Sequence, residues 1–240
     1  MSKRYPEENI YTAGQVILVN KPLHWTSFDV VRKVRNLTKS KVGHAGTLDP
    51  LATGLLICCT GKFTKRISQY QAQEKEYTGI FTIGAETPTY DLESEPQNFK
   101  DFSAVTAGQI LSTAEQFRGE LNQIPPAYSA VKKDGKPLYH SARKGIEVKA
   151  EARRIFIKEF EIVRIDLPQI HFRVVCSTGT YIRSLVYDFG KASGCGAYLN
   201  ALCRTRIGDF LLKDAYQMEL LEDVIKTNLL RKDNLLQNSE

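Results

Sequence analysis

The stretch that decides the fold is Gly43-His44-Ala45-Gly46-Thr47-Leu48-Asp49-Pro50-Leu51-Ala52-Thr53-Gly54. Its three glycines and one proline favour an irregular loop over a helix or a strand. Asp49 directly precedes Pro50, which disfavours the helical conformation and restricts Asp49 to an extended or turn conformation. The stretch therefore predicts a conformationally restricted carboxylate on a loop, which fits either a functional site or an Asx-type turn that joins a helix to a strand.

The bulk composition is that of a globular protein with a substantial core. The chain has 240 residues, of which 42% are hydrophobic, enough for one large domain or two small ones. Lys and Arg outnumber Asp and Glu by 33 to 27, which gives a formal net charge of +6. This balance favours a polyanionic partner, but solvated surface lysines give the same excess.

The cysteines and histidines lack the spacing of a metal site or of a disulfide framework. Residues 1–11 are polar and do not resemble a signal peptide, and no run of about 18 apolar residues could cross a bilayer. We therefore expect a cytoplasmic protein with reduced thiols, no metal and no membrane partner. The residues concerned are Cys58, Cys59, Cys176, Cys195, Cys203, His24, His44, His140 and His171.

A basic segment leads into the glycine-containing stretch. Residues 16–19 predict a short buried strand, and Ser27 is a candidate N-cap for a helix whose apolar face contains Phe28, Val31, Val34 and Leu37. No acidic residue occurs between Val30 and Leu48, so the approach to the loop is uniformly positive. Arg32, Lys33 and Lys41 could follow an RNA phosphate backbone, or they could form an ordinary solvated face.

Two strands are predicted after the loop. Residues 55–59 form a continuous apolar run, and residues 75–83 alternate so that Tyr77 lies on the apolar face. On this pattern Tyr77 is a half-buried core tyrosine. Residues 87–101 are rich in proline, serine and acidic residues and predict a surface excursion.

The rest of the chain alternates strands with helices that do not separate them regularly, which favours an α+β fold of about eight or more strands. Thr106 and Gln109 form a capping box, and Thr180 could cap a helix that places Arg183 in its first turn, where a cation needs an anionic partner. The remaining expected elements are an edge segment at 124–129, a turn at 134–135, a short helix at 137–144, antiparallel strands at 155–165 and 170–176, and a helix at 218–230.

The opening stretch closely resembles the signature loop of the TruB family of tRNA pseudouridine synthases. The resemblance is collinear and covers about residues 14–215. Its further blocks are Asn20-Lys21-Pro22, Lys75-Glu76-Tyr77 with Gly84, Thr87 and Asp91, Ile124 to Lys132, Cys176 to Ser184, and Leu202 to Phe210.

This resemblance implies conversion of uridine 55 in the T loop of tRNA to pseudouridine, without cofactor or metal. It implies the pseudouridine synthase fold, a mixed and largely antiparallel sheet flanked by helices with a central catalytic cleft. Asp49 would be the catalytic carboxylate, Tyr77 the ring that stacks on the target base, and Arg183 the ion-pair partner of Asp49. The implied substrate-binding positions are His44, Leu202, Tyr181 and Lys21, to which the basic segment adds Arg32, Lys33 and Lys41.

The chain is expected to form one domain over residues 1–240, with a helical terminal segment at 216–240 and no PUA domain. We expect a monomer. Two other functions remain open at this level: a pseudouridine synthase that acts on another RNA, and a non-catalytic tRNA-folding chaperone. A weaker alternative is a hydrolase with an aspartate nucleophile.

Overall fold

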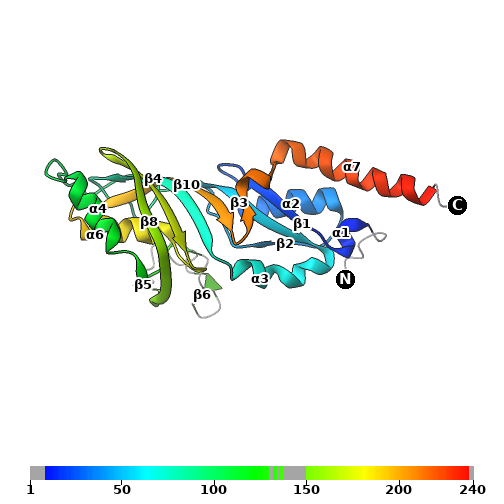
Figure 1. The fold of residues 1–240 in the computed structure, drawn as a ribbon, viewed down its shortest axis with the longest axis horizontal. Helices are drawn as coiled ribbons and strands as arrows, with labels where there is room; N and C mark the ends of the chain where they lie inside the picture. Colours follow the sequence, from blue (N-terminus) through cyan, green and yellow to red (C-terminus); the bar gives the residue numbers. More distant parts are fainter. Residues whose placement is uncertain (1–8, 130–131, 134–135, 138–149, 238–240) are drawn as a thin grey trace. The chain divides into compact units, whose positions relative to one another are not determined.

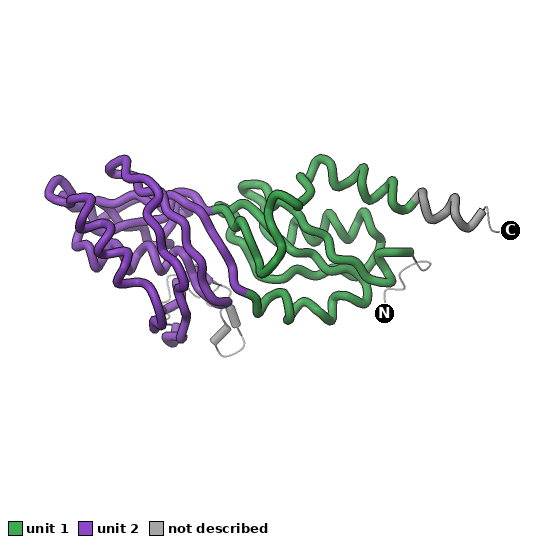
Figure 2. Tube along the Cα trace, viewed as in Figure 1, with its two compact units in different colours: residues 1–73, 203–240 green, residues 74–202 purple. Residues whose placement is uncertain are grey.

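The computed structural model describes residues 9–129, 132–133, 136–137 and 150–237. Contacts within the chain define two compact units: unit 1 comprises residues 1–73 and 203–240, and unit 2 comprises residues 74–202 (Figure 2). The expectation of one domain stays a prediction, because a division by contacts does not decide whether the units fold independently.

Unit 1 is built on three strands that lie next to one another in an order different from their order in the sequence (Figure 1). Strand β3 pairs antiparallel with β1, Val19 lying opposite Leu56, and antiparallel with β2, His44 lying opposite Cys58. The described elements of unit 1 are α1 (Ile10–Ala13), β1 (Val16–Lys21), α2 (Ser27–Thr38), β2 (Val42–Ala45), β3 (Ala52–Thr60), η1 (Gly61–Arg66), α3 (Ile67–Gln71), β11 (Phe210–Leu211), η2 (Leu212–Asp214), β12 (Tyr216–Gln217) and α7 (Met218–Gln237).

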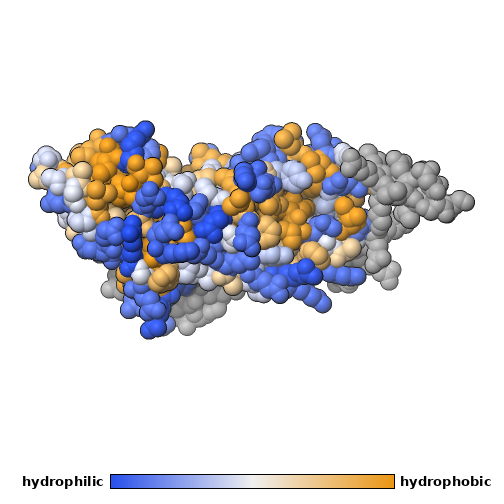
Figure 3. All heavy atoms as spheres, viewed as in Figure 1, coloured by the Kyte–Doolittle hydropathy of each residue, from blue (hydrophilic) through white to orange (hydrophobic). Residues whose placement is uncertain are grey.

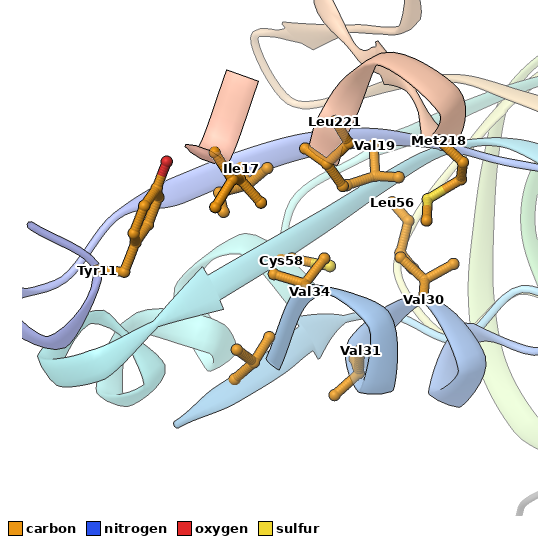
Figure 4. Close-up of a cluster of buried hydrophobic side chains, with 12 residues drawn as sticks. Tyr11, Ile17, Val19, Val30, Val31, Val34, Leu56, Cys58, Met218 and Leu221 are labelled. Atoms are coloured by element: carbon orange, nitrogen blue, oxygen red, sulfur yellow. The ribbon is translucent and has the colours of Figure 1, made fainter. Parts of the chain in front are cut away.

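The core of unit 1 covers both faces of β3. On one face, Leu56 and Cys58 pack with Val30 and Val34 of α2 and with Leu221 of α7 (Figure 4). On the other face, a second cluster contains Leu55, Ile57, Cys59 and Ile207. Burial on both sides explains why this strand reads as a continuous apolar run and does not alternate.

Unit 2 is an antiparallel sheet with helices packed on one face. Strand β9 lies between β4 and β8, and β8 pairs with β5. Phe189 of the helix α6 packs against Phe81 and Phe160 of the sheet, with ring centroids 4.9 and 6.2 Å apart. The described elements are β4 (Lys75–Ile83), α4 (Ala107–Glu115), β5 (Gly119–Gln123), β6 (Lys132–Lys133), β7 (Lys136–Pro137), β8 (Arg153–Asp166), β9 (Gln169–Cys176), α6 (Ile182–Ala192) and β10 (Ala197–Ile207), which runs on into unit 1.

The predicted fold class is confirmed: ten of the described strands form a mostly antiparallel sheet, which is mixed because β12 pairs parallel with β1, and β6 and β7 pair separately. The strands expected at 16–19, 55–59, 75–83, 155–165 and 170–176 are present, as are the capping box at Thr106 and the C-terminal helix. The five cysteines are free, as expected. The turn expected at 134–135 and the helix expected at 137–144 lie outside the described residues, apart from the β7 residues 136–137.

Two predicted helix caps were wrong. The N-cap of α2 is Thr26, which forms a capping box with Asp29, and Phe28 is 60% exposed and does not lie on the buried face. The N-cap of α6 is Tyr181, and the Thr180 hydroxyl instead donates to the carbonyl of Ser177. In both places the pattern of apolar residues located the helix, but an adjacent residue took the cap position.

Candidate active site

The glycine-containing stretch is a tight connection between two strands. Its ends belong to β2 and β3, so the predicted irregular loop is limited to residues 46–51. Asp49 lies in a turn, where its carbonyl accepts a hydrogen bond from Ala52 N at 3.0 Å. Asp49 is partly exposed, whereas Leu48 beside it is only 3% exposed. The loop therefore buries an apolar anchor next to a partly exposed aspartate.

Ser27 ties this anchor to helix α2. Its hydroxyl accepts from Leu48 N at 2.9 Å and donates to Leu48 O at 3.2 Å. Both backbone groups of one loop residue are thereby satisfied by one buried side chain, which restricts the loop directly before Asp49.

Lys21 supports the other side of Asp49. Its side chain is fully buried, and Nζ donates to the carbonyls of Pro22, Trp25 and Pro50 at 2.9, 2.5 and 3.4 Å. Burial lowers the pKa of Lys21 to about 8, against an opposing effect from the charge of Asp49. An ammonium group has three donors, and all three are used within the protein. Lys21 therefore has a structural role beneath the loop, and its contact with substrate stays a prediction.

Arg204 is a third support, which the sequence analysis missed. The side chain is 1% exposed; Nε donates to Leu55 O at 2.8 Å and Nη2 donates to Gly46 O at 3.0 Å. The residue belongs to a block that carries the family resemblance, but nothing in its local pattern marks it as buried.

The glycines of the stretch are explained by the protein's own packing. Gly54 has φ +104°, and a Cβ there would lie 2.4 Å from Arg204 O. At Gly43 a Cβ would lie 2.6 Å from Cδ1 of Ile67. These two glycines let neighbouring segments of the protein approach closely.

His44 lies on β2 and is partly buried. Burial lowers the pKa of its imidazole, with a backbone hydrogen bond at Gly46 acting in the opposite direction. The side chain is therefore neutral near pH 7 and suited to hydrogen bonding or stacking with a base. Its contact with substrate stays a prediction.

Two cations of the basic segment are paired with carboxylates from outside it, and their contact with phosphate stays a prediction. Arg32 forms an ion pair of 2.7 Å with Asp29, and Lys33 one of 2.7 Å with Glu222 of α7. Both partners lie outside the acid-free interval, one just before it and the other 189 residues away.

The third predicted residue, Lys41, is exposed, and its carbonyl accepts from Gly61 N at 2.8 Å. Around it, η1 adds the exposed side chains of Lys62, Lys65 and Arg66. None of these four cations is paired with a carboxylate in the part of the chain that the structure describes. Hydrophilic atoms gather on the surface along η1 and α3 (Figure 3).

In unit 2, Arg183 occupies the first turn of α6 and is 4% exposed. Its Nη1 and Nη2 donate to the carbonyls of Thr89 and Tyr128 at 3.2 and 3.0 Å, and its Nε lies 3.6 Å from Oδ2 of Asp91. A buried guanidinium requires a nearby anion. The prediction that an anion faces Arg183 is confirmed, with Asp91 as that anion; the predicted pairing with Asp49 stays a prediction.

Asp91 also corrects the expectation of a surface excursion at 87–101. Thr87, Thr89 and Asp91 are 2%, 5% and 3% exposed, so part of this segment is core. Thr89 and Asp91 contribute the backbone and carboxylate oxygens that surround Arg183.

The remaining predicted residues of unit 2 are placed by strands and by the start of α6. Tyr77 on β4 is 7% exposed and lies opposite Val174, so it is more buried than the half-buried position expected. Leu202 on β10 is partly exposed. Gln123 holds Tyr181 by donating to its carbonyl at 3.0 Å and accepting from its N–H at 2.8 Å. Base contacts by these residues stay predictions.

Two further observations concern the described residues alone. They contain no group of three or more His, Cys, Asp or Glu side chains that could hold a metal ion. None of their helices is both long and apolar enough to cross a membrane.

The mostly antiparallel sheet is that of the pseudouridine synthase class. A solved chain described as "Crystal Structure of a Cbf5-Nop10-Gar1 Complex" matches with a TM-score of 0.69 and 30% identity, covering 89% of this chain and 54% of that chain. One described as "Structure of H/ACA RNP bound to a substrate RNA containing 2'-deoxyuridine" matches with a TM-score of 0.66 and 26% identity, covering 89% of this chain and 53% of that chain. The chain thus spans about half the length of these two solved chains.

Sequence relatives narrow the class. A "tRNA pseudouridine synthase B" of Flavobacterium johnsoniae is 54% identical over 92% of this chain and 99% of its own length. A protein of the same description from Parabacteroides distasonis is 46% identical over 92% of this chain and 97% of its own length. The family model "TruB family pseudouridylate synthase (N terminal domain)" matches residues 33–182, and "tRNA pseudouridylate synthase B C-terminal domain" matches residues 183–238.

The chain belongs to the TruB family of pseudouridylate synthases, isomerases that convert uridine to pseudouridine in tRNA. The second match extends the resemblance beyond the predicted limit near residue 215, so α7 is part of the family architecture. Neither matched model is a PUA domain.

Proposed function

We propose that this enzyme acts on uridine 55 in the T loop of tRNA and that Asp49 is its catalytic carboxylate. The observation that carries the proposal is the support of the loop: Ser27, Lys21 and Arg204 hold Leu48, Pro50 and Gly46, while Asp49 between them stays partly exposed. Three buried anchors from separate segments around one partly exposed aspartate favour a preorganised reactive group over a simple turn.

The chemistry needs a carboxylate in its ionised form. The bond between N1 of uracil and C1′ breaks, a bond between C5 and C1′ forms, and the proton of C5 is released while N1 gains one, so the atoms balance without a cofactor. A carboxylate can add to the sugar or the base, or take a proton from the sugar. We assign to Arg183 the role of a counter-ion that favours the ionised carboxylate.

Tyr77 is proposed to stack on the target base. A uridine within a folded loop must be extruded before it can react, at a cost of roughly a few kcal/mol. Stacking on an aromatic ring offsets this cost by about 1–3 kcal/mol. Tyr77 is 7% exposed on β4, which supports such a role because a ring restricted by packing loses little freedom on binding.

We further propose that the phosphate backbone contacts Lys41 together with Lys62, Lys65 and Arg66. Their side chains are exposed, and no described carboxylate pairs with them. Arg32 and Lys33, by contrast, are each paired with a carboxylate. Charge reversal at Lys62 and Lys65 should weaken tRNA binding and reduce the log-log salt slope by about one for each phosphate that is no longer bound. An unchanged slope would refute this assignment.

The central test compares Asp49→Asn with Asp209→Asn, a matched change at an exposed aspartate of the same unit. Release of tritium from 5-tritiated uridine in a T-arm stem-loop should be lost in the first variant and retained in the second. Full activity of Asp49→Asn would refute the catalytic role. Arg183→Ala should lose turnover while binding falls less; the opposite pattern would make Arg183 a phosphate ligand.

The alternative substrate is another RNA, because the matched solved chains include one from an H/ACA RNP bound to a substrate RNA. The near full-length likeness to tRNA pseudouridine synthase B relatives favours tRNA. Mapping pseudouridine in total RNA from a deletion strain separates the two. Loss of a ribosomal site with an intact T loop would overturn the assignment to uridine 55.

A further inference from the structure

Two tyrosines of unit 2 stack beside the ion pair between Arg183 and Asp91. The rings of Tyr90 and Tyr187 have centroids 3.9 Å apart and planes inclined by 14°. Tyr90 immediately precedes Asp91, and Tyr187 follows Arg183 by four residues on α6, which places Arg183 and Tyr187 on the same face of the helix. Two consecutive residues of the 87–91 segment therefore meet two residues one helical turn apart.

The backbone of Tyr90 is held in an unfavourable conformation. Its φ is +65°, in the left-handed region that residues with a Cβ rarely adopt. Its N–H donates to Thr87 O at 3.1 Å, and its carbonyl accepts from Leu199 N at 2.9 Å. The ring stack with Tyr187 accompanies this conformation, directly before Asp91 in the chain.

The other ring is also held in place. The Nζ atom of Lys191, one further turn along α6, lies 4.6 Å from the centroid of Tyr187. A cation over an aromatic face stabilises the ring orientation. Tyr187 thus offers Tyr90 a surface that is fixed by its own helix.

We propose that Tyr90 and Tyr187 are positioning residues that hold the Asp91 carboxylate against Arg183. The distance between Arg183 Nε and Asp91 Oδ2 is 3.6 Å, at the long end of an ion pair. Arg183 also donates to Thr89 O at 3.2 Å, so both contacts of the 87–91 segment with Arg183 lie at one position of α6. The stack adds a contact one turn farther along the helix, which limits tilting of the segment about Arg183. The inference rests on the proposed role of Arg183 in turnover.

The test measures kcat and KM for tRNA in Tyr187→Ala and Tyr187→Phe, with Phe117→Ala as control. Phe117 packs against Phe189 of the same helix at 6.3 Å, so its removal also costs α6 an aromatic contact, but one that is not linked to Asp91. Tyr187→Ala should lower kcat about tenfold, with KM changed less than about twofold. Tyr187→Phe keeps the stack and should restore kcat, and Phe117→Ala should lower the melting temperature with kcat unchanged.

A double-variant cycle shows whether the stack acts through the ion pair. Asp91→Asn with Tyr187→Ala should be no slower than Asp91→Asn alone. If Tyr187→Ala does not fold, Tyr90→Gly removes the stack while accepting the positive φ, and the same loss of kcat is expected.

If the variants that lack the stack keep the wild-type kcat while Asp91→Asn and Arg183→Ala lose activity, the inference about the stack is overturned and the proposed role of Arg183 stands. Multiplicative losses in the double variant would do the same. Full activity of Asp91→Asn and Arg183→Ala would overturn the inference together with the proposed role of Arg183.

Discussion

Replacement of Gly54 by alanine tests whether close packing of β3 on β10 supports the candidate active-site loop. The added Cβ would lie 2.4 Å from Arg204 O and 2.6 Å from Arg204 N, and φ at this position is +104°. Both neighbouring atoms are backbone atoms, so no side-chain rotation can relieve the clash. The strands must separate locally.

The size of the effect follows from two contributions. An alanine at this φ costs about 1–2 kcal/mol. An ordinary contact begins near 3.4 Å, so the backbones must move apart by about 1 Å. That movement lengthens the 2.8 Å bond between Arg204 Nε and Leu55 O beyond hydrogen-bonding distance. Loss of a bond from a charged donor costs about 1.5–3 kcal/mol. The total is about 3–5 kcal/mol, a fall of about 10 °C in Tm for a chain of this size.

Thermal melting followed by circular dichroism and by the fluorescence of Trp25, the single tryptophan and a residue of unit 1, measures the change. Two alanine variants separate the contributions. Gly119 has φ +91°, and no atom lies within 4 Å of the place that its Cβ would take, so Gly119→Ala reports the backbone cost alone. Gly43 lacks the positive φ and meets only the flexible end of Ile67, so Gly43→Ala reports a clash that can relax.

Gly54→Ala should lower Tm by clearly more than either Gly119→Ala or Gly43→Ala. A Tm for Gly54→Ala equal to that of Gly119→Ala would mean that the approach of Arg204 contributes nothing beyond the backbone conformation. The reasoning about the glycines of the loop would then be refuted. A large loss in Gly43→Ala would instead show that side-chain contacts in unit 1 relax less than expected.

Three further predictions concern the surroundings of the loop. Ser27→Ala should cost about 1–3 kcal/mol, because both backbone groups of Leu48 lose a buried partner, and it should lower turnover. The pKa of Lys21 is lowered from the ordinary 10.5 to about 8 in the folded protein, so between pH 8 and 10.5 the unfolded state holds more protons than the folded state. The free energy of unfolding should therefore rise with pH, by about 3 kcal/mol over this interval. Lys21→Met should lack this rise in urea titrations. Glu222→Gln should free Lys33 and, if Lys33 reaches phosphate, steepen the log-log salt slope of tRNA binding by about one with little change in Tm.

A different result would contradict each of the three predictions on Ser27, Lys21 and Glu222. Thr26→Ala removes the cap of α2 without touching Leu48, at about 1 kcal/mol, and an equal loss of turnover there would remove the special role of Ser27. Parallel pH profiles for wild type and Lys21→Met would contradict the buried ammonium. A salt slope unchanged by Glu222→Gln would leave Lys33 as a partner of α7 alone.

Local patterns predicted the elements well because their causes are local. The apolar run of β3, the strand β4 and the capping box at Thr106 each depend on residues a few positions apart, and each was confirmed, although burial in β4 alternates only over its first residues. The caps at Ser27 and Thr180 failed because neighbouring residues can take the same position, and contacts elsewhere decide which one is used. Ser27 is engaged by Leu48, 21 residues away.

The supports of the candidate site could not be read from local patterns, because their partners are distant in the sequence. Arg204 donates to Leu55 O across 149 residues, and Arg183 donates to Thr89 O across 94. The acid-rich composition of residues 87–101 indicated a solvated surface, and only the fold shows that Asp91 within it is the buried partner of a cation. Composition reports the average environment of a segment and not that of each residue in it.

The contrast between Lys21 and Lys41 shows what fixes the function of a cation in this protein. Both occur in the basic, family-like part of the chain, and sequence alone gave both the same role. Lys21 has all three donors satisfied by carbonyls and no exposed surface, so phosphate could bind it only by breaking the support of the loop. Lys41 is exposed among other cations that no described carboxylate neutralises, so phosphate can approach it at little structural cost. The same charge thus supports the candidate loop from inside the protein at one position and faces solvent at the other, and the difference depends on desolvation, which a residue pattern does not record.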